Sequence, residues 1–177
     1  MTEDRSNKLK KLISTTESRT KRTYSLWQLL TYHNNSISTE ELFSYIPLIW
    51  KIDISNKKYF GVRQKLENEI RKRQNNETIL SLIKLLKHDD PNLRFVATDL
   101  LNHFKSKIII EPLLMYLKHT TDPFLTRKQA ICALKHYKDE RIKSFLNKEL
   151  ENNKANPETF FRNNYIKTIE SVIEKVS

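Results

Sequence analysis

Four residues in the second half of the chain have side chains that could hold a metal ion. Asp99 and His103 are four residues apart, and so are Cys132 and His136. This spacing places both members of a pair on one face of a helix, and carboxylate, imidazole and thiolate groups all bind zinc. The next equivalent position holds Lys167, which has no lone pair to offer a metal. Because polar residues also recur at this spacing on any solvated helix face, the sequence favours a surface that faces a partner, with no metal or other cofactor.

No set of residues combines a nucleophile with a base. Cys132 falls in the middle of a predicted helix, away from a helix N-terminus that would activate a thiol. Glu40 and Glu41 are explained by helix capping, and Glu67 and Glu69 are two residues apart, so they do not share a helix face. The sequence therefore favours a protein without catalytic chemistry of its own.

Composition sets limits on the class of protein. The chain has 177 residues, which fits one domain or one domain with an appendage, and its single glycine is Gly61. A chain with one glycine cannot build a phosphate-binding loop or a dinucleotide-binding turn, because both need several. One cysteine cannot form an internal disulfide, which indicates a reducing compartment. We expect a cytoplasmic protein without a membrane-spanning segment.

The chain is basic, with a formal net charge of +11. Residues 1–76 carry 15 basic and 8 acidic side chains, and residues 77–177 carry 17 and 13. A positive field of this size favours acidic proteins or nucleic acids as partners. A lysine-rich composition also arises without function in proteins of AT-rich genomes, so the charge alone leaves both interpretations open.

Apolar residues recur with helical period in almost every segment, and no segment alternates as a strand does. The sequence therefore predicts an all-α fold. Ser38 and Glu41 form a capping box, and Pro47 is expected to kink or split the helix that follows. Trp27 and Trp50 fall on apolar stripes and are predicted to lie in the core.

A repeat begins at about residue 77, with units at 77–106, 107–138 and 139–177. Its markers are Arg94, Arg127 and Arg162, which are 33 and 35 residues apart. An Asx-Pro pair that is predicted to start a helix precedes each arginine: Asp90-Pro91, Asp122-Pro123 and Asn156-Pro157. Apolar positions follow at +3, +6, +7 and +10, which form one buried helical stripe. They are Ala97, Leu100, Leu101 and Phe104; Ala130, Ala133, Leu134 and Tyr137; and Tyr165, Thr168, Ile169 and Val172.

The motifs Leu-Lys-His-x-Asp-Pro-x-Leu-Arg-x-x-Ala and Thr-Arg-Lys-Gln-Ala-x-x-Ala-Leu-Lys-His-Tyr resemble HEAT repeats, in the subclass also found in phycobilin lyases. The resemblance covers about residues 77–177 and departs from the family where its usual glycine is Asn102, Lys135 and Glu170. It implies a right-handed α-α superhelix, a short HEAT-like solenoid, with residues 1–76 as a basic N-terminal helical cap or degenerate repeats. It also implies an internal ladder between repeats, formed by Asp90, Arg94, Asp122, Arg127 and Arg162.

The resemblance further implies that the second helix of each pair lines a concave surface. The residues predicted to bind a partner there are Phe95, Asn102, His103, Lys128, Cys132, Lys135, His136 and Lys167. We expect a protein-binding module or adaptor that holds an acidic protein partner, with Phe95 exposed among basic groups. Two alternatives stay open: a helical-repeat protein that binds nucleic acid, and, by family resemblance only, a phycobilin lyase or a chaperone-like subunit of one.

Overall fold

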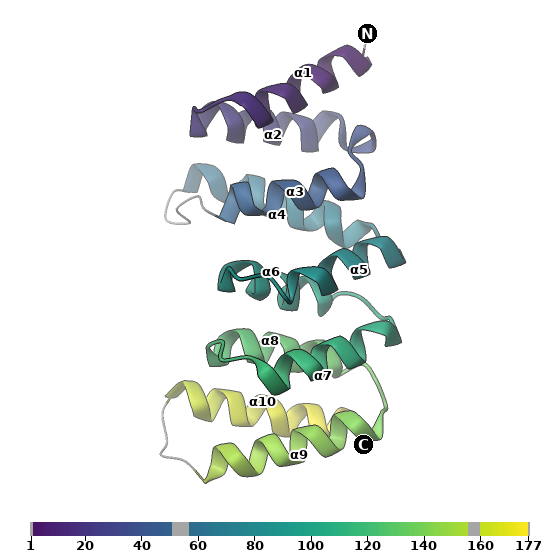
Figure 1. Cartoon of the computed structure of the whole chain (residues 1–177), viewed down its shortest axis with the longest axis vertical. Coiled ribbons are helices and arrows are strands. Elements are labelled where there is room, and N and C mark those ends of the chain that lie inside the picture. The colour runs from purple at the N-terminus through teal and green to yellow at the C-terminus, as the bar shows by residue number, and fades with distance from the viewer. Residues whose placement is uncertain (1, 51–56, 156–159, 177) are drawn as a thin grey trace. The chain divides into compact units, whose positions relative to one another are not determined.

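The computed structural model describes residues 2–50, 57–155 and 160–176. Over these residues the chain forms α-helices and two short 3₁₀ helices, without a β-strand (Figure 1), so the predicted all-α class is confirmed. The helices are α1 (Thr2–Thr15), α2 (Arg19–Tyr32), η1 (Asn34–Ser36), α3 (Thr39–Trp50), α4 (Lys57–Lys72), α5 (Asn76–Leu85), α6 (Pro91–Leu101), η2 (Lys107–Ile109), α7 (Ile110–His119), α8 (Phe124–Leu134), α9 (Glu140–Lys154) and α10 (Phe160–Val176).

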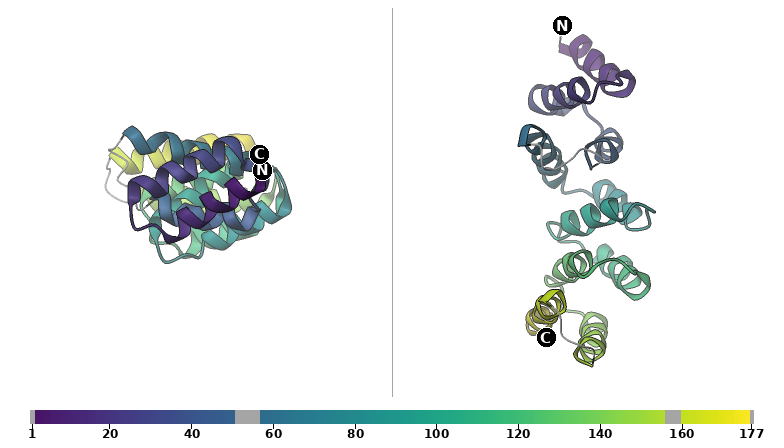
Figure 2. Two further views of the ribbon diagram at one scale, coloured as in Figure 1. Left: turned by 90° about the horizontal axis from the view of Figure 1, so that it is seen from above. Right: turned by 90° about the vertical axis from the view of Figure 1, so that its left-hand side faces the viewer.

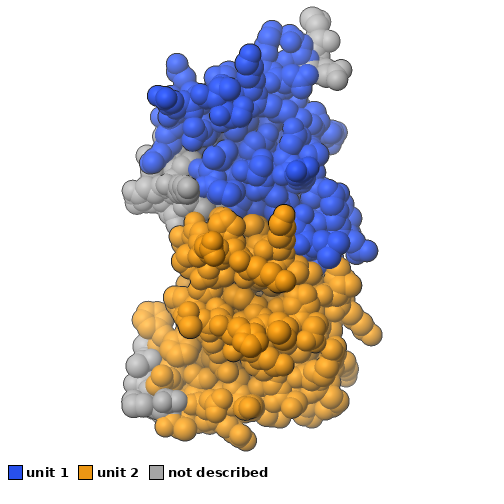
Figure 3. Space-filling view, viewed as in Figure 1, with its two compact units in different colours: residues 1–81 blue, residues 82–177 orange. Residues whose placement is uncertain are grey.

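The chain divides into two compact units (Figure 3). Unit 1 is Met1–Ser81 and unit 2 is Leu82–Ser177. The boundary falls inside α5, whereas the sequence pattern places it after residue 76. Each unit has fully buried apolar side chains of its own, so each contains a hydrophobic core.

Unit 1 is built around α2, which packs against α1 and α4, while α3 also packs against α4. Ile13, Leu26 and Leu66 are at most 1% exposed and hold these helices together. The prediction that Trp27 lies in the core is wrong, because its side chain is only half-buried. The side chain of Trp50 lies outside the described residues.

Helix α3 begins at the predicted capping box. The amide of Glu41 donates to Ser38 Oγ at 3.1 Å, and the amide of Ser38 donates to Glu41 Oε2 at 2.8 Å. Pro47 lies inside α3, and the helix continues past it to Trp50, so the expected split does not occur. A proline inside a helix lowers the stability of the helix by about 3 kcal/mol. Burial of one or two large apolar side chains offsets this loss. Ile46 is completely buried one residue before the proline.

The helices of unit 2 lie in two rows. Helix α8 packs against both α6 and α10, and α7 contacts α8 and α9. The right-hand view of Figure 2 separates the row of α6, α8 and α10 from the row of α7 and α9. The second helices of the predicted repeat units therefore lie next to one another.

The predicted stripe faces the core between these rows. All of its members are buried except Thr168, which is half-buried and donates its hydroxyl to the carbonyl of Asn164 at 2.9 Å. Phe104 and Tyr165 are the largest of the fully buried side chains of the stripe. Burial of each large apolar side chain contributes roughly 1.5–3 kcal/mol, so this shared stripe is the main source of cohesion in unit 2.

The Asx-Pro pairs behave differently from one another. Asp90 caps α6 as predicted and accepts from the amide of Asn92 at 2.9 Å. Asp122 does not cap α8: the N-cap of α8 makes no side-chain hydrogen bond, and the Asp122 carboxylate binds Arg94 instead. The third pair, Asn156-Pro157, lies outside the described residues.

Two general properties of the backbone and helices complete the fold. No residue in the described parts of the chain has a positive φ, and this includes Gly61 within α4. None of the described helices is both long enough and apolar enough to cross a membrane.

Candidate functional site

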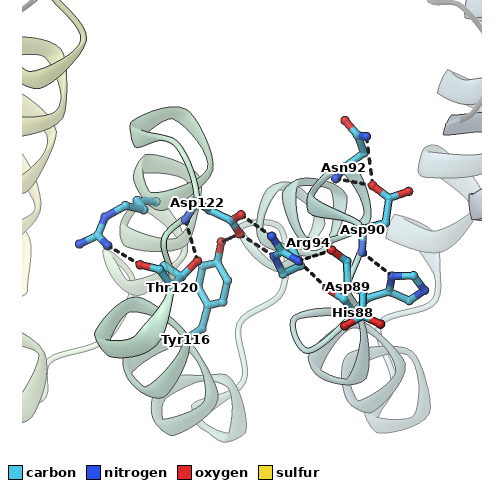
Figure 4. Close-up of polar contacts among 9 residues, drawn as sticks. His88, Asp89, Asp90, Asn92, Arg94, Tyr116, Thr120 and Asp122 are labelled. Carbon is cyan, nitrogen blue, oxygen red and sulfur yellow. Dashed lines mark hydrogen bonds and ion pairs between the residues drawn. The ribbon is translucent and has the colours of Figure 1, made fainter.

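Arg94 joins α6 to the segment between α7 and α8 (Figure 4). Its Nε donates to Asp122 Oδ2 at 2.7 Å, and its Nη1 donates to the carbonyls of His88 and Asp89 at 2.6 and 2.7 Å. The Tyr116 hydroxyl donates to the same carboxylate at 2.6 Å. The Arg94 guanidinium and the Asp122 carboxylate therefore both have partners inside unit 2, and the pair links two successive units of the predicted repeat.

The electrostatics of this pair follow from these contacts. The hydrogen bonds from Arg94, and then from Tyr116, hold the pKa of Asp122 below its usual range, although burial opposes them. Burial and the bond to Asp122 raise the pKa of Tyr116 to about 12. Asp122 is therefore a charged acceptor and Tyr116 a neutral donor at neutral pH, which is the combination that the observed bonds require.

Arg127 occupies the equivalent position in α8 but has a different acidic partner. It forms an ion pair with Glu149 of α9, and its Nε donates to the Tyr165 hydroxyl at 3.2 Å. Tyr165 in turn donates to Glu149 Oε1 at 2.9 Å. The guanidinium of Arg162 lies 5.6 Å from the ring centroid of Phe124. Arg127 and Arg162 thus contact neighbouring helices of unit 2, whereas Arg94 binds the segments before α6 and before α8.

The row of α6, α8 and α10, with the turns that follow α6 and α8, carries a group of basic residues that we call the lysine face: Lys105, Lys128, Lys135, His136 and Lys175. The lysines lie near Cys132 and His136, and their charges change the pKa of both side chains. Burial raises the pKa of the Cys132 thiol, and the charges of Lys135, Lys128 and Lys175 partly oppose this increase. Burial, and then the charges of Lys135, Lys105 and Lys175, lower the pKa of His136, so its imidazole is neutral at neutral pH and the positive charge of the face comes from its lysines. Lys128 also reaches across to α10, where its Nζ donates to Asn164 Oδ1 at 2.7 Å.

The predicted partner-binding residues are not equally accessible. His103, His136 and Lys167 are exposed, and Lys128, Cys132, Lys135 and Asn102 are half-buried. The expectation that Phe95 is exposed is wrong, because its side chain is half-buried. A large ring next to a buried stripe can fold over the apolar surface beside it. Helical period gives the face of the helix on which a residue lies but not this side-chain packing.

Two members of the lysine face were missed by the sequence reasoning. Lys175 lies at +13 from Arg162, one helical turn beyond +9, which is the offset of His103 and His136 from their arginines and the last one used for the predicted surface. Lys105 follows the end of α6 at +11 from Arg94, an offset that was not used for the predicted surface. Extension of the register by one turn would have found Lys175.

The four candidate metal ligands do not form a metal site. Within residues 2–50, 57–155 and 160–176, no group of three or more His, Cys, Asp or Glu side chains could hold a metal ion. Asp99, His103, Cys132 and His136 are therefore not assembled as ligands. Their surroundings are cationic instead, because lysines act on both Cys132 and His136.

Cys132 is expected to react slowly with alkylating agents. Burial raises the pKa of the Cys132 thiol, and the nearby lysines only partly oppose this effect. A raised pKa leaves less thiolate at neutral pH, so iodoacetamide should modify Cys132 several-fold more slowly than free cysteine at pH 7. The rate of modification should increase with pH for both thiols, but for Cys132 it should reach its plateau at a higher pH than for free cysteine. Mass spectrometry of timed samples measures both quantities, and a faster reaction than free cysteine at pH 7 would contradict the assignment.

A hollow of about 680 Å³ lies in unit 2 between the end of α5 and helix α7, beside Arg94. Its apolar wall includes Leu86 and Met115, and Met115 is 45% exposed. Its rim carries charges of both signs, among them Lys87 and Glu111. The mixed charge favours no particular ligand, and the hollow is lined by different residues from the lysine face.

Neither the models of known protein families nor the curated proteins contain a match to this chain. The HEAT-like character of residues 77–177 therefore stays a prediction that rests on the motifs themselves.

Proposed function

We propose that the chain is a non-catalytic binding module whose C-terminal unit is a short HEAT-like stack of helical pairs. The packing of α8 against both α6 and α10, with α7 and α9 in a second row, supports this proposal. The ties from Arg94 to Asp122 and from Arg127 to Glu149 also support it, since each joins neighbouring helical pairs. Stacked pairs share a core that a single pair could not bury.

The lysine face is the surface that holds the partner. The single observation that carries this proposal is the gathering of lysines around Cys132 and His136: Lys105, Lys128, Lys135 and Lys175 each act on one or both of these side chains, and Lys128 also spans to Asn164 of α10. A cluster of like charges is unfavourable for an isolated protein, because the cations repel one another. An anionic partner would relieve this repulsion and gain attraction from several lysines at once.

The partner that fits this face best is an acidic segment of a protein. Lysine ammonium groups are flexible point charges that pair well with carboxylates. Two rings that adjoin this face, Phe95 and Tyr137, offer no open surface to a base, since Phe95 is half-buried and Tyr137 is 7% exposed. Attraction between the lysine face and carboxylates would accelerate encounter and weaken as salt is added.

A labelled peptide rich in glutamate and aspartate tests this function. The full-length protein should bind the peptide at low salt, as measured by fluorescence anisotropy, and a peptide of the same length with the amides Gln and Asn should not bind. The double variant Lys128→Glu/Lys135→Glu should weaken binding at least about tenfold, which corresponds to about 1.4 kcal/mol. The matched control is Lys118→Glu/Lys148→Glu, which makes the same change of charge at exposed positions of α7 and α9.

Two results would overturn the proposal. The first is an unchanged affinity of the Lys128→Glu/Lys135→Glu variant for the acidic peptide. The second is an equal loss of affinity in the Lys118→Glu/Lys148→Glu control, which would show that net charge rather than the lysine face attracts the peptide. Circular dichroism of each variant establishes that its helices are intact.

A further inference from the structure

Unit 1 carries an aromatic cluster on α2, made of Tyr24, Trp27 and Tyr32. The rings of Tyr24 and Trp27 are stacked, with centroids 6.1 Å apart and planes 12° apart. The rings of Tyr32 and Trp27 form a T-shaped pair, with planes 85° apart and centroids 5.9 Å apart. Tyr24 is 60% exposed and Tyr32 is 65% exposed. Large rings left open in this way are unusual on a soluble surface and mark a place where another molecule binds.

Cations of α4 adjoin the aromatic cluster. The Lys65 ammonium lies 5.6 Å from the centroid of the Trp27 ring, within the range of a cation–π interaction. Lys65 also lines a hollow of about 440 Å³ in unit 1, together with Arg71 and Lys72. Since Lys65 belongs to both features, the aromatic cluster and the basic hollow form one continuous surface.

The acidic side chains of this surface are covered. Glu67 and Glu69 have side chains that are only 13% and 12% exposed. Arg63 Nε donates to Glu67 at 2.9 Å, and Glu69 accepts from Lys72 and from Asn34, both at 3.4 Å. The side chain of Lys72, by contrast, is 69% exposed. The charge that an incoming ligand meets is therefore positive, although α4 itself contains acids.

We propose that this surface of unit 1 binds single-stranded nucleic acid, with bases stacked on Tyr24 and Tyr32 and phosphates held by Lys65 and Lys72. Open aromatic rings beside cations are what an unpaired strand needs, because each base has a π-face and each nucleotide a negative charge. Bases of a duplex are already stacked on one another and cannot reach the rings. An acidic protein would use the cations but would leave the tyrosine faces without a matching group.

The proposal is tested with the full-length protein and a fluorescein-labelled oligothymidylate of about 12 nucleotides, a length within the usual site size of such surfaces. Anisotropy should show binding at about 50 mM salt, with an affinity that falls as salt is added. The variant Tyr24→Ala/Tyr32→Ala should bind at least about tenfold more weakly, because stacking contributes about 1–3 kcal/mol per base. The variant Tyr24→Phe/Tyr32→Phe should retain binding, since it keeps both rings.

The controls separate this surface from others. Phe161 is 69% exposed in unit 2, so Phe161→Ala removes a similarly open ring elsewhere and should leave the affinity unchanged. Lys65→Gln and Lys72→Gln should each reduce the slope of log affinity against log salt by about 1. The lysine-face variant Lys128→Glu/Lys135→Glu should bind the oligonucleotide as the unaltered protein does.

Several results would overturn the inference: no binding at about 50 mM salt, an unchanged affinity of the Tyr24→Ala/Tyr32→Ala variant, or a duplex of equal length bound as tightly as the single strand. Loss of oligonucleotide binding in the lysine-face variant would also overturn it, because the nucleic acid would then occupy unit 2. Failure here leaves the acidic-peptide experiment unaffected, since the two tests alter different units.

Discussion

Replacement of Asp122 by alanine should lower the free energy of unfolding of unit 2 by about 3–5 kcal/mol. The Asp122 side chain is 3% exposed, and its removal leaves the Arg94 guanidinium, itself 20% exposed, without its carboxylate. It also removes the acceptor of the buried Tyr116 hydroxyl. Urea unfolding followed by far-UV circular dichroism measures the loss, and a decrease below about 1 kcal/mol would contradict the assigned role.

The control for this experiment is Asp139→Ala. Asp139 caps α9 and binds Arg141, whose side chain is 60% exposed. Loss of such a cap costs about 1 kcal/mol, so the two aspartates should differ clearly. In addition, the double variant Arg94→Ala/Asp122→Ala should be less destabilised than the sum of its single variants, because the second substitution removes a group that the first had left unpaired.

Replacement of Phe104 by alanine should also destabilise unit 2 by about 3–5 kcal/mol. Phe104 is completely buried, and its carbonyl accepts from the Tyr137 hydroxyl at 3.0 Å. The substitution leaves a cavity that the surrounding helices can only partly fill. Urea unfolding measures the change, and the exposed ring of Phe161 provides the control, since Phe161→Ala should change stability by less than about 0.5 kcal/mol.

Fluorescence assigns these changes to a unit. Both tryptophans of the chain, Trp27 and Trp50, belong to unit 1. Tryptophan emission therefore follows the unfolding of unit 1, whereas circular dichroism follows the helices of both units. If Phe104→Ala moved only the tryptophan transition, the assignment of Phe104 to the core of unit 2 would be wrong.

Helical period predicted the all-α class and most of the core of unit 2. Positions such as Ala97, Leu134 and Val172 are buried as expected, because a helix with one apolar face must bury that face. The capping box at Ser38 was also predictable, since both of its bonds are local. Local patterns are therefore sufficient where the contacts themselves are local.

Contacts between distant residues account for the errors. The sequence pattern predicts that Asp122 caps a helix. In the folded chain Arg94 and Tyr116 lie close to Asp122, and both donate hydrogen bonds to its carboxylate. Trp27 falls on an apolar stripe, yet the period of a stripe does not reveal how far neighbouring helices cover its edge. The aromatic cluster was missed for the same reason, because exposure of Tyr24 depends on packing rather than on local pattern.

The helix connections that lie within residues 2–50, 57–155 and 160–176 use no residue at positive φ. These connections therefore need no glycine to avoid the steric penalty of a positive φ. A chain with so few glycines also has a less flexible unfolded state to restrict when it folds. The entropic cost of folding is reduced accordingly. Substitutions in these turns should therefore be tolerated far better than substitutions in the buried apolar stripe of unit 2. Distant relatives of this chain would then share the spacing of their buried residues and few of the residues themselves.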